Sequence, residues 1–518
     1  MRKLNFTLAC LLLMAIAIVS CKKTDNNTPT STTTQQTNSS PYHGTPTISG
    51  YVTPYYTGSD TLAKGYTNPA APLKLKGTLK AGTYYLDGYV YVPVGDTLFV
   101  ESGVTIMAIG GSASTASPYG FTIRGTFISQ GTQTSPNLFT VPDAYKSLNG
   151  GYGGCWTGLN ADSAQNFTLK WTKVEYMGGP SGTSATTLGI SCEYTQAIDV
   201  EDSWIRFTYD DGFRIHSTVN CIVQRNTFEH CGGTGGGESL NIKDGATGDI
   251  SYNIFWNSAT KCIKLETNAT ALVPQTSYNI YNNTCINTGF RNTAKPGPGT
   301  SIDLNTWANV WNNLYINCSR GFMEYYTTAS GADTVHSRYN YNGFFSTNTN
   351  IDSSAPGITG GQYFTEPLDD EYYTGYAPQY PPSPISGGDI GVVGYPQPND
   401  VFIPVAPASS QTVIVKLDDY STDIALTDWE IGTGGFGGTA PYNPTLASGS
   451  PVIGKGFSAG LPAAYLHGGA AGKGVVTNTT WVTYQNQGRS GLTITPTPGA
   501  DLGAKQSTSS SQQYQNQH

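Results

Sequence analysis

Charged side chains are scarce in this chain, at 12% of its 518 residues, about half the share that is usual for soluble domains. Long exposed helices need Glu and Lys as well as Ala and Leu, so this scarcity argues against a helical protein. Glycine and tyrosine are plentiful instead, with 62 and 34 residues. Together with Thr and Asn they favour short strands joined by tight turns. The composition therefore predicts an all-β fold.

Dense basic tracts and metal-binding cysteine pairs are also missing. The formal net charge is −8 and no run of Lys and Arg interrupts it, which argues against a nucleic-acid partner. No C-x-x-C pair occurs and the six histidines are scattered, so a structural zinc site is not expected. Mild acidity is compatible with a neutral glycan, or with an acidic polysaccharide reached through a local basic pocket or a bound cation.

The N-terminus has an apolar run that is too short to span a membrane. Arg2 and Lys3 precede apolar residues 8–19, which is the layout of a secretory signal peptide covering residues 1–20. Residues 18–21 (IVSC) resemble a bacterial lipobox. That resemblance implies cleavage before Cys21, acylation of Cys21 (palmitate) and anchoring in the outer membrane, on a face that the sequence does not give. An ordinary signal peptide that happens to contain a cysteine is the alternative.

Two low-complexity segments flank the part expected to fold. Residues 21–46 are the expected lipidated cysteine and a flexible tether of Thr, Asn, Ser and Pro, and residues 505–518 are a polar tail. Seven cysteines remain in the folded part, and we expect most of them to be small buried hydrophobes. They are Cys155, Cys192, Cys221, Cys231, Cys262, Cys285 and Cys318.

The central part of the chain repeats. Residues 172–177, 202–207, 226–231, 253–258, 283–288 and 313–318 share one pattern and start 30, 24, 27, 30 and 30 residues apart. A second set of alternating segments lies between them, at 190–192, 213–215, 240–242, 263–265, 302–304 and 322–324. Strands this short cannot each form a hairpin core, whereas stacked coils bury one continuous apolar column. A β-propeller, the main alternative, would need repeats of about 40 residues.

The repeat also contains Asn226, Asn253, Asn283 and Asn313 at one position. An amide there can hydrogen-bond to the same position one coil away, and asparagine tolerates a left-handed turn backbone. The sequence therefore predicts a right-handed parallel β-helix over residues 47–345. Residues 346–504 fit the pattern less well and are expected to form the last coils and long C-terminal loops of the same solenoid.

Both ends of this region resemble known proteins. Residues 88–106, 121–126 and 138–141 resemble the opening coils of bacterial β-helix proteins of the pectate-lyase-like superfamily, and residues 446–456 and 500–504 resemble their closing segment. The resemblance covers about residues 73–504. It implies the fold, while the architecture itself hosts lyases, hydrolases, adhesins and binding proteins.

Ionisable residues gather on the second set of strands. Because neighbouring coils lie about 4.8 Å apart, equivalent outward residues should touch. One expected column is Ser191, Arg214, Asn241, Lys264, Asp303 and Met323, and the other is Glu193, His216, Lys243, Glu266, Asn305 and Tyr325. Asp210, Asp211 and Glu238 precede these strands.

Such a strip suits β-elimination of an acidic polysaccharide. Arg214 would neutralise a uronate carboxylate, and Lys243 or Lys264 would remove the adjacent proton, with His216 as a further catalytic candidate. Glu238, Glu266 and Asp303 are candidate Ca²⁺ ligands. Asn241, Asn305 and Tyr325 are candidate sugar contacts. An inverting glycosidase would instead use a pair from Asp210, Asp211 and Asp303.

Residues 238–243 (ESLNIK), followed by 252–255 (YNIF), resemble the signature of the alginate-lyase and chondroitinase-B family. The resemblance implies that Lys243 is the catalytic lysine. The arginine that this family presents on the next coil is replaced here by Glu266. A faint resemblance to the signature of polygalacturonases is carried by Asp210, Asp211 and Asn241. The other elements of that signature are missing from this sequence.

The sequence thus leads to a surface or periplasm-facing lipoprotein that binds, and by hypothesis cleaves, an acidic polysaccharide. Two alternatives stay open. The charged strip could be a salt-bridge ladder in which Lys243 pairs with Glu266 and Lys264 with Asp303. The protein would then be a non-catalytic adhesin or glycan-binding scaffold.

Overall fold

The computed structural model describes residues 54–345, with gaps at 59, 180–187, 218–220, 234–235, 268–275, 287, 290–296, 304–305, 317, 319 and 325–337. It also describes residues 368–369, 401–403, 415–416, 445–446, 453–458, 464–465, 475–476, 499 and 501–504. The expected signal peptide, Cys21, the tether and most of the tail lie outside these residues, as do Asn305 and Tyr325.

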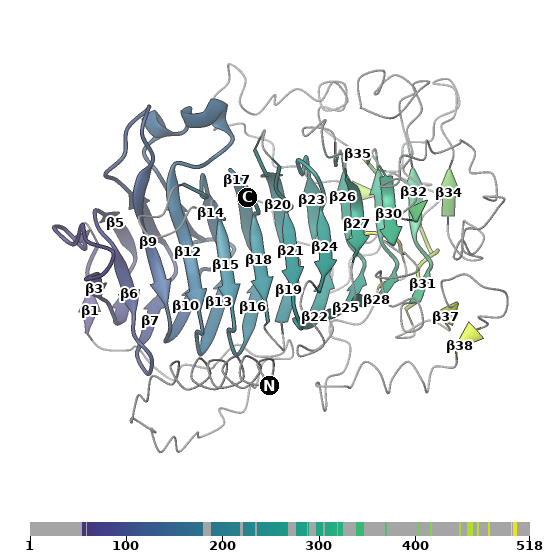
Figure 1. The fold of residues 1–518 in the computed structure, drawn as a ribbon, viewed down its shortest axis with the longest axis horizontal. Coiled ribbons are helices and arrows are strands. Elements are labelled where there is room, and N and C mark those ends of the chain that lie inside the picture. The colour runs from purple at the N-terminus through teal and green to yellow at the C-terminus, as the bar shows by residue number, and fades with distance from the viewer. Residues whose placement is uncertain are drawn as a thin grey trace, which may run out of the picture. The chain divides into compact units, whose positions relative to one another are not determined.

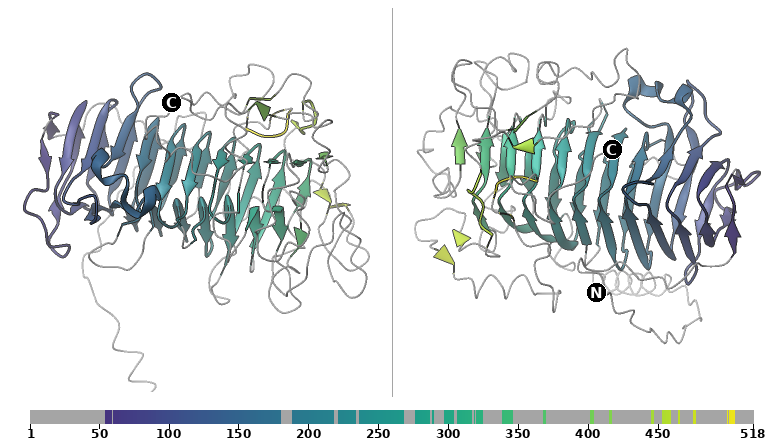
Figure 2. Two further views of the ribbon diagram at one scale, coloured as in Figure 1. Left: turned by 90° about the horizontal axis from the view of Figure 1, so that it is seen from above. Right: turned by 180° about the vertical axis from the view of Figure 1, so that it is seen from behind.

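The described chain winds through three parallel sheets, here called A, B and C, and visits them in that order once per coil. From β4 to β30, each strand pairs with the strand three places earlier and three places later, as β11 (Asn137–Thr140) does with β8 (Val104–Ala108) and β14 (Thr172–Glu175). In Figure 1 the colours run in sequence order from purple to green across the stack, and Figure 2 shows the same order from above and from behind. The fold is a right-handed parallel β-helix, and the prediction from the repeat is confirmed.

Sheet A has 11 strands: β1 (Tyr55–Tyr56), β4 (Gly77–Leu79), β7 (Thr97–Val100), β10 (Thr126–Gln130), β13 (Asn166–Lys170), β16 (Ile198–Glu201), β19 (Cys221–Gln224), β22 (Thr247–Ser251), β25 (Thr276–Tyr281), β28 (Thr306–Trp311) and β31 (Arg338–Asn340). Sheet B has 12: β2 (Thr61–Leu62), β5 (Gly82–Leu86), β8, β11, β14, β17 (Trp204–Thr208), β20 (Thr227–Cys231), β23 (Ile254–Trp256), β26 (Thr284–Ile286), β29 (Leu314–Ile316), β32 (Gly343–Phe345) and β34 (Val401–Ile403).

Sheet C has 11 strands: β3 (Leu73–Lys74), β6 (Val90–Val92), β9 (Ser117–Ile123), β12 (Trp156–Asp162), β15 (Ile190–Glu193), β18 (Phe213–His216), β21 (Leu240–Lys243), β24 (Ile263–Glu266), β27 (Pro298–Ile302), β30 (Arg320–Glu324) and β33 (Leu368–Asp369). Two antiparallel pairs follow, β35 (Val415–Lys416) with β36 (Thr445–Leu446) and β37 (Ala464–Tyr465) with β38 (Val475–Val476). The short 3-10 helices η1 (Asp143–Tyr145) and η2 (Leu148–Gly151) lie between β11 and β12, in blue in Figure 1.

The core is a column of inward side chains contributed by all three sheets. Val174, Ile205, Phe228 and Phe255 follow one another on sheet B and are each fully buried. The rings of Phe228 and Phe255 stack with centroids 4.9 Å apart. Because each coil repeats the same inward positions, like side chains meet across coils and one continuous core results.

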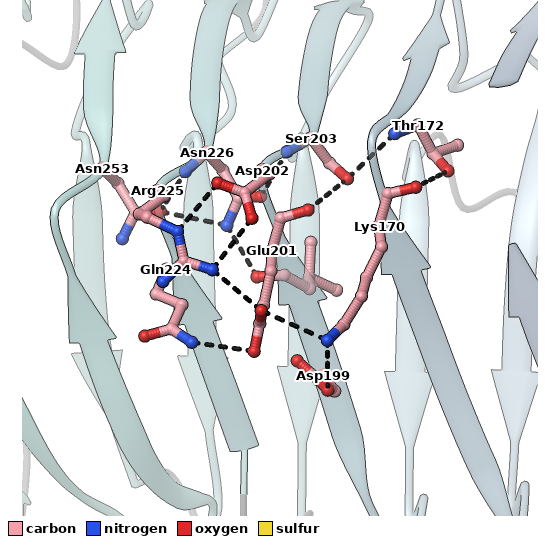
Figure 3. A network of polar contacts seen from close by, with 11 residues as sticks. Lys170, Thr172, Asp199, Glu201, Asp202, Ser203, Gln224, Arg225, Asn226 and Asn253 are labelled. Atoms are coloured by element: carbon pink, nitrogen blue, oxygen red, sulfur yellow. Dashed lines mark hydrogen bonds and ion pairs between the residues drawn. The ribbon is translucent and has the colours of Figure 1, made fainter. Parts of the chain in front are cut away.

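The asparagine ladder runs along the turn between sheets A and B. The Oδ1 atom of Asn253 accepts from the backbone N–H and the Nδ2 of Asn226, at 2.9 and 3.0 Å. Asn253, Asn283, Asn313 and Asn342 continue the pattern. The predicted amide contacts are therefore present, and Figure 3 shows Asn226 and Asn253 side by side at this turn.

Two details of the ladder differ from the prediction. The left-handed backbone belongs to the residue before each asparagine, such as Tyr252 (φ 57°) and Asn282 (φ 52°), and not to the ladder asparagine itself. In the coil before Asn226, the ladder position is taken by Ser203, whose N–H donates to Asn226 Oδ1, and not by Asp202. The frame expected for residues 202–207 is thus wrong by one residue, because Asp202 occupies the left-handed turn position.

All seven cysteines from Cys155 onward are buried thiols, as expected from their use as small hydrophobes. Burial raises the pKa of the Cys155 thiol to about 12, with smaller opposing effects of Lys146 and Glu175. Across the described residues, no helix combines the length and the apolar character that crossing a bilayer would require.

Candidate functional site

Sheet C is the face that leaves polar groups within reach of solvent. From β17 onward most outward residues of sheet B, such as Trp204, Thr227 and Ile254, are at most 6% exposed, and the partly exposed Arg206 is bound to Glu175 at 2.8 Å. On sheet C, by contrast, Arg214, His216 and Lys243 are partly exposed. A ligand outside the solenoid can therefore meet ionisable side chains on sheet C.

The predicted columns are correct as far as β24. Ser191, Arg214, Asn241 and Lys264 are register partners, and so are Glu193, His216, Lys243 and Glu266. The next coil corrects the prediction, because Lys264 pairs with Ser301 and Ser301 with Met323. Asp303 therefore lies one step beyond the Leu265–Ile302 pair, beside Glu266 and not beside Lys264. The slip arose because the inward position on this strand is held by a polar residue, Thr300, which binds the hydroxyl of buried Tyr315 at 2.9 Å.

Lys243 and Lys264 are both bound to one carboxylate. Lys243 Nζ lies 2.6 Å from Glu266 Oε1, and Lys264 Nζ lies 2.5 Å from Glu266 Oε2. Burial raises the pKa of Glu266, but the two lysines outweigh it and hold that pKa at about 2. For Lys264, burial lowers the pKa, yet the surrounding carboxylates leave it above its usual value. Lys264 is therefore an ammonium at neutral pH, which is the wrong form for a general base.

Glu238 and Asp303 are the other two expected Ca²⁺ ligands, and both face lysines. Lys261 Nζ lies 3.9 Å from Glu238 Oε1 and 3.7 Å from Asp303 Oδ2. Lys264 Nζ lies 4.0 Å from each of the same two oxygens. Within the described part of the chain, no group of three or more His, Cys, Asp and Glu side chains is arranged to hold a metal. The ammonium groups supply the positive charge that Ca²⁺ would bring, so these residues do not fit a Ca²⁺ site.

Asp211 and Glu238 form a hydrogen-bonded carboxyl pair at the start of this cluster. Burial and the neighbouring Glu238 raise the pKa of Asp211 well above its usual value. Burial also acts to raise the pKa of Glu238, but the hydrogen bond from Asp211 and the nearby lysines bring it below its usual value. The contact between the two carboxyl groups thus moves their pKa values apart.

His216 is clamped between two carboxylates. Its Nδ1 lies 2.9 Å from Glu193 Oε1 and its Nε2 lies 2.6 Å from Asp244 Oδ2. Both ring nitrogens are thus engaged by carboxylate oxygens of the protein. With both nitrogens engaged in this way, the ring is poorly placed to accept a proton from a substrate.

Arg214 differs from the other predicted catalytic residues, because its Nε is buried and finds no acceptor in the part of the chain that the structure describes. Its neighbour in register, Asn241, donates from Nδ2 to Asp211 Oδ2 at 2.8 Å, while its Oδ1 has no partner among those residues. One donor and one acceptor are thus left open on adjacent coils.

A hollow of about 250 Å³ ends at Arg214. Its floor follows the column that leads to Arg214 and consists of the short polar residues Thr122, Asn160 and Ser191. Tyr89 contributes to the wall and is held by an edge-to-face contact with Tyr119, with ring centroids 5.3 Å apart. Polar groups below and an aromatic ring beside them are suited to a sugar. Ser191 and Arg214 were predicted to be neighbours in this column, but Thr122, Asn160 and the hollow were not, because its walls come from coils far apart in sequence.

A second ionic network, which the sequence analysis missed, lies where sheet A turns into sheet B (Figure 3). Glu201 binds Arg225 Nη2 at 2.8 Å and Lys170 Nζ at 3.3 Å, and Arg225 also binds Asp202. Burial acts to raise the pKa of Glu201, but the two cations outweigh it and lower that pKa. Glu201 and Arg225 are only 1% and 7% exposed, so this network stabilises the turn and offers no open group to a ligand.

The predicted site residues therefore divide into three groups. Lys243, Lys264, Glu238, Glu266 and Asp303 lie in one connected set of ion pairs on sheet C, and His216 lies in a separate one with Glu193 and Asp244. Arg214 and Asn241 keep open hydrogen-bonding atoms, and Asn305 and Tyr325 lie outside the described residues. Comparison of the chain with protein-family models, with curated proteins and with solved structures finds no match in any of the three.

Proposed function

We propose that the protein binds an acidic polysaccharide along the outer face of sheet C, with Arg214 binding a carboxylate of the glycan. The observation that carries the proposal is the hollow that ends at Arg214, whose buried Nε has no acceptor among the described residues. Guanidinium groups pair with carboxylates through parallel hydrogen bonds, and an open buried donor favours a ligand that supplies the missing acceptor.

Binding has more support than cleavage. β-Elimination needs a base that can accept a proton, and the candidates Lys243, Lys264 and His216 are each held in short ion pairs. Charge pairs between successive coils agree with the salt-bridge ladder considered from the sequence. A glycan-binding scaffold, rather than a polysaccharide lyase, is therefore the form of the proposal that the geometry favours.

Binding of the full-length protein to alginate, polygalacturonate, hyaluronan and chondroitin tests the proposal. The substitution Arg214→Ala should weaken binding by about 10- to 100-fold, the range expected for losing a charge-assisted hydrogen bond. Arg124→Ala is the matched control, because Arg124 lies on the same face but is 50% exposed and already paired with Asp162 at 2.6 Å. Equal effects of the two substitutions would refute a specific role for Arg214.

The same samples test cleavage and Ca²⁺. Unsaturated products that absorb ultraviolet light would establish a lyase, and new reducing ends without that absorbance would establish a hydrolase. A chelator that lowers the melting temperature or the glycan affinity would support the Ca²⁺ expectation, which the lysines around Glu238 and Asp303 do not favour.

We also propose that the protein is a lipoprotein of the outer membrane. The support is the N-terminal sequence alone, since Cys21 lies outside the described residues. Labelling cells with a palmitate analogue should mark the protein, and Cys21→Ala should abolish the label and release the protein from the membrane fraction. A label that persists in Cys21→Ala would contradict the proposal.

A further inference from the structure

The charges that line the hollow are few and of known position. Of its 13 lining residues, Arg214 is the one cation and Glu193 the one anion, and the others are polar, apolar or aromatic. Thr122, Asn160 and Ser191 lead away from Arg214 along the floor in successive coils, at a spacing of about 4.8 Å. A second carboxylate placed over that floor would meet hydroxyl and amide groups, but no cation among the lining residues.

Glu193 makes the hollow unfavourable for additional negative charge. Its side chain is 42% exposed, and its Oε1 lies 2.9 Å from His216 Nδ1. The same imidazole is shared with Asp244 at 2.6 Å, so one imidazole ring faces two carboxylates. The rim beside Arg214 therefore carries excess negative charge.

The coils on the other side of Arg214 have no cation to spare either. Lys243 and Lys264 both bind Glu266, and Lys261 lies between Glu238 and Asp303. On the N-terminal side, the outward Arg124 is paired with Asp162, and the exposed Lys74 lies five strands before Arg214 in the same outward column. A polymer with a carboxylate on every residue would thus place several charges between Lys74 and Arg214, where this column holds no cation.

We infer that the ligand carries widely spaced carboxylates, as in a glycan in which uronate and uncharged sugar residues alternate, and that Glu193 selects against homopolymeric uronates. The inference rests on the proposed function and narrows it to one substrate class. Arg214 takes one carboxylate, and the floor of Thr122, Asn160 and Ser191 takes the hydroxyl or amide groups of a neutral neighbour. Like charges brought together at a binding surface suppress the wrong partner.

The test compares oligosaccharides of equal length from hyaluronan, which alternates glucuronate with an uncharged sugar, and from polygalacturonate, by calorimetry at low salt. The hyaluronan oligosaccharide should bind about tenfold more tightly or better. Glu193→Gln should raise the affinity for polygalacturonate by about two- to fivefold, since a partly exposed charge is screened, and should change hyaluronan binding less. Asp162→Asn, made together with Arg124→Gln so that no cation is released, is the matched control, because it removes a carboxylate of the same face that does not line the hollow.

The two proposals fail in different ways. Polygalacturonate that binds as tightly as hyaluronan, with no gain from Glu193→Gln, would overturn the selection against dense charge while leaving glycan binding at Arg214 intact. Loss of discrimination in Glu193→Gln but not in the matched control would support it. No binding to either oligosaccharide, or binding that Arg214→Ala does not weaken, would overturn the proposed function and this inference with it.

Discussion

Replacement of Asn283 by alanine should be among the most destabilising single changes in the solenoid. Asn283 is 1% exposed and its amide takes part in five hydrogen bonds. Its Oδ1 accepts from the N–H and the Nδ2 of Asn253, both at 3.0 Å. Its Nδ2 donates to Ile250 O at 3.0 Å, Tyr281 O at 3.2 Å and Asn313 Oδ1 at 2.9 Å.

The size of the stability loss depends on which hydrogen-bond partners of Asn283 keep another hydrogen bond in the variant. Asn253 Nδ2 still donates to Val223 O, and Asn313 Oδ1 still accepts from the N–H of residue 283. The backbone N–H of Asn253 loses its acceptor, which costs about 1–3 kcal/mol for a buried group. Adding about 0.5–1.5 kcal/mol for each of the four other bonds gives a loss of at least about 3 kcal/mol in the free energy of unfolding.

Urea unfolding followed by circular dichroism measures this loss. Asn160→Ala is the control, because Asn160 is an exposed asparagine on the outer face of β12, and its replacement should change the free energy of unfolding by less than about 0.5 kcal/mol. Asn283→Asp separates donor from acceptor. It keeps the acceptor oxygen but replaces the amide donor with a second carboxylate oxygen facing Ile250 O and Asn313 Oδ1, so it should be at least as damaging at pH 7 and milder at pH 4. A loss below about 1 kcal/mol in Asn283→Ala would refute the argument that buried amide contacts between coils stabilise the fold.

Three further predictions follow from other parts of the molecule. The pKa of Asp211 is raised in the folded state, so above about pH 4 the unfolded state binds fewer protons than the folded state does. The stability that Asp211 contributes is therefore lost as the pH rises. The melting temperature of Asp211→Asn should accordingly fall less between pH 4 and pH 8 than that of the wild type. An identical dependence of the melting temperature on pH in the two proteins would contradict the raised pKa of Asp211. Asn312, at φ 57°, binds Phe457 N–H and O at 2.8 and 3.0 Å, so Asn312→Gly keeps the left-handed backbone but frees that segment. Limited proteolysis should then cut near residues 453–458 faster, with little change in the melting temperature of the solenoid. Burial raises the pKa values of the Cys192, Cys285 and Cys318 thiols, so a disulfide reagent should label them only after unfolding, and rapid labelling of native protein would be the contrary result.

The fold was predictable because its signals are local and repeat. Alternation with period two identified the inward residues of β15, β18, β21 and β24, and these gave the correct neighbours for Arg214 and Lys243. The same signal failed at Thr300, where a polar residue points inward because it binds Tyr315. The alternation signal also failed at Asp202, because the turn before β17 is one residue longer than the repeat suggested. A slip of one or two residues cannot be seen when either frame alternates equally well.

The chemistry of the site was less predictable, because it depends on which charges meet. The sequence placed Lys243 beside Glu266, but it could not tell that Lys264 would turn to the same carboxylate instead of to Asp303. It could not show that His216 is held on both sides, since Asp244 lies in the following turn. Side-chain torsions and loop paths decide these pairings, and neither is encoded in a repeat.

The asparagine ladder gives the solenoid a polarity. From Asn226 onward, the Nδ2 of each ladder asparagine donates a hydrogen bond to the Oδ1 of the asparagine in the next coil, and all four of these bonds run in the same direction. The two ends of the stack are therefore chemically different, one offering an amide oxygen and the other an amide hydrogen. A duplicated or transplanted coil can join this stack in a single orientation, so the fold can grow in steps of one whole coil but cannot be extended by an inverted one.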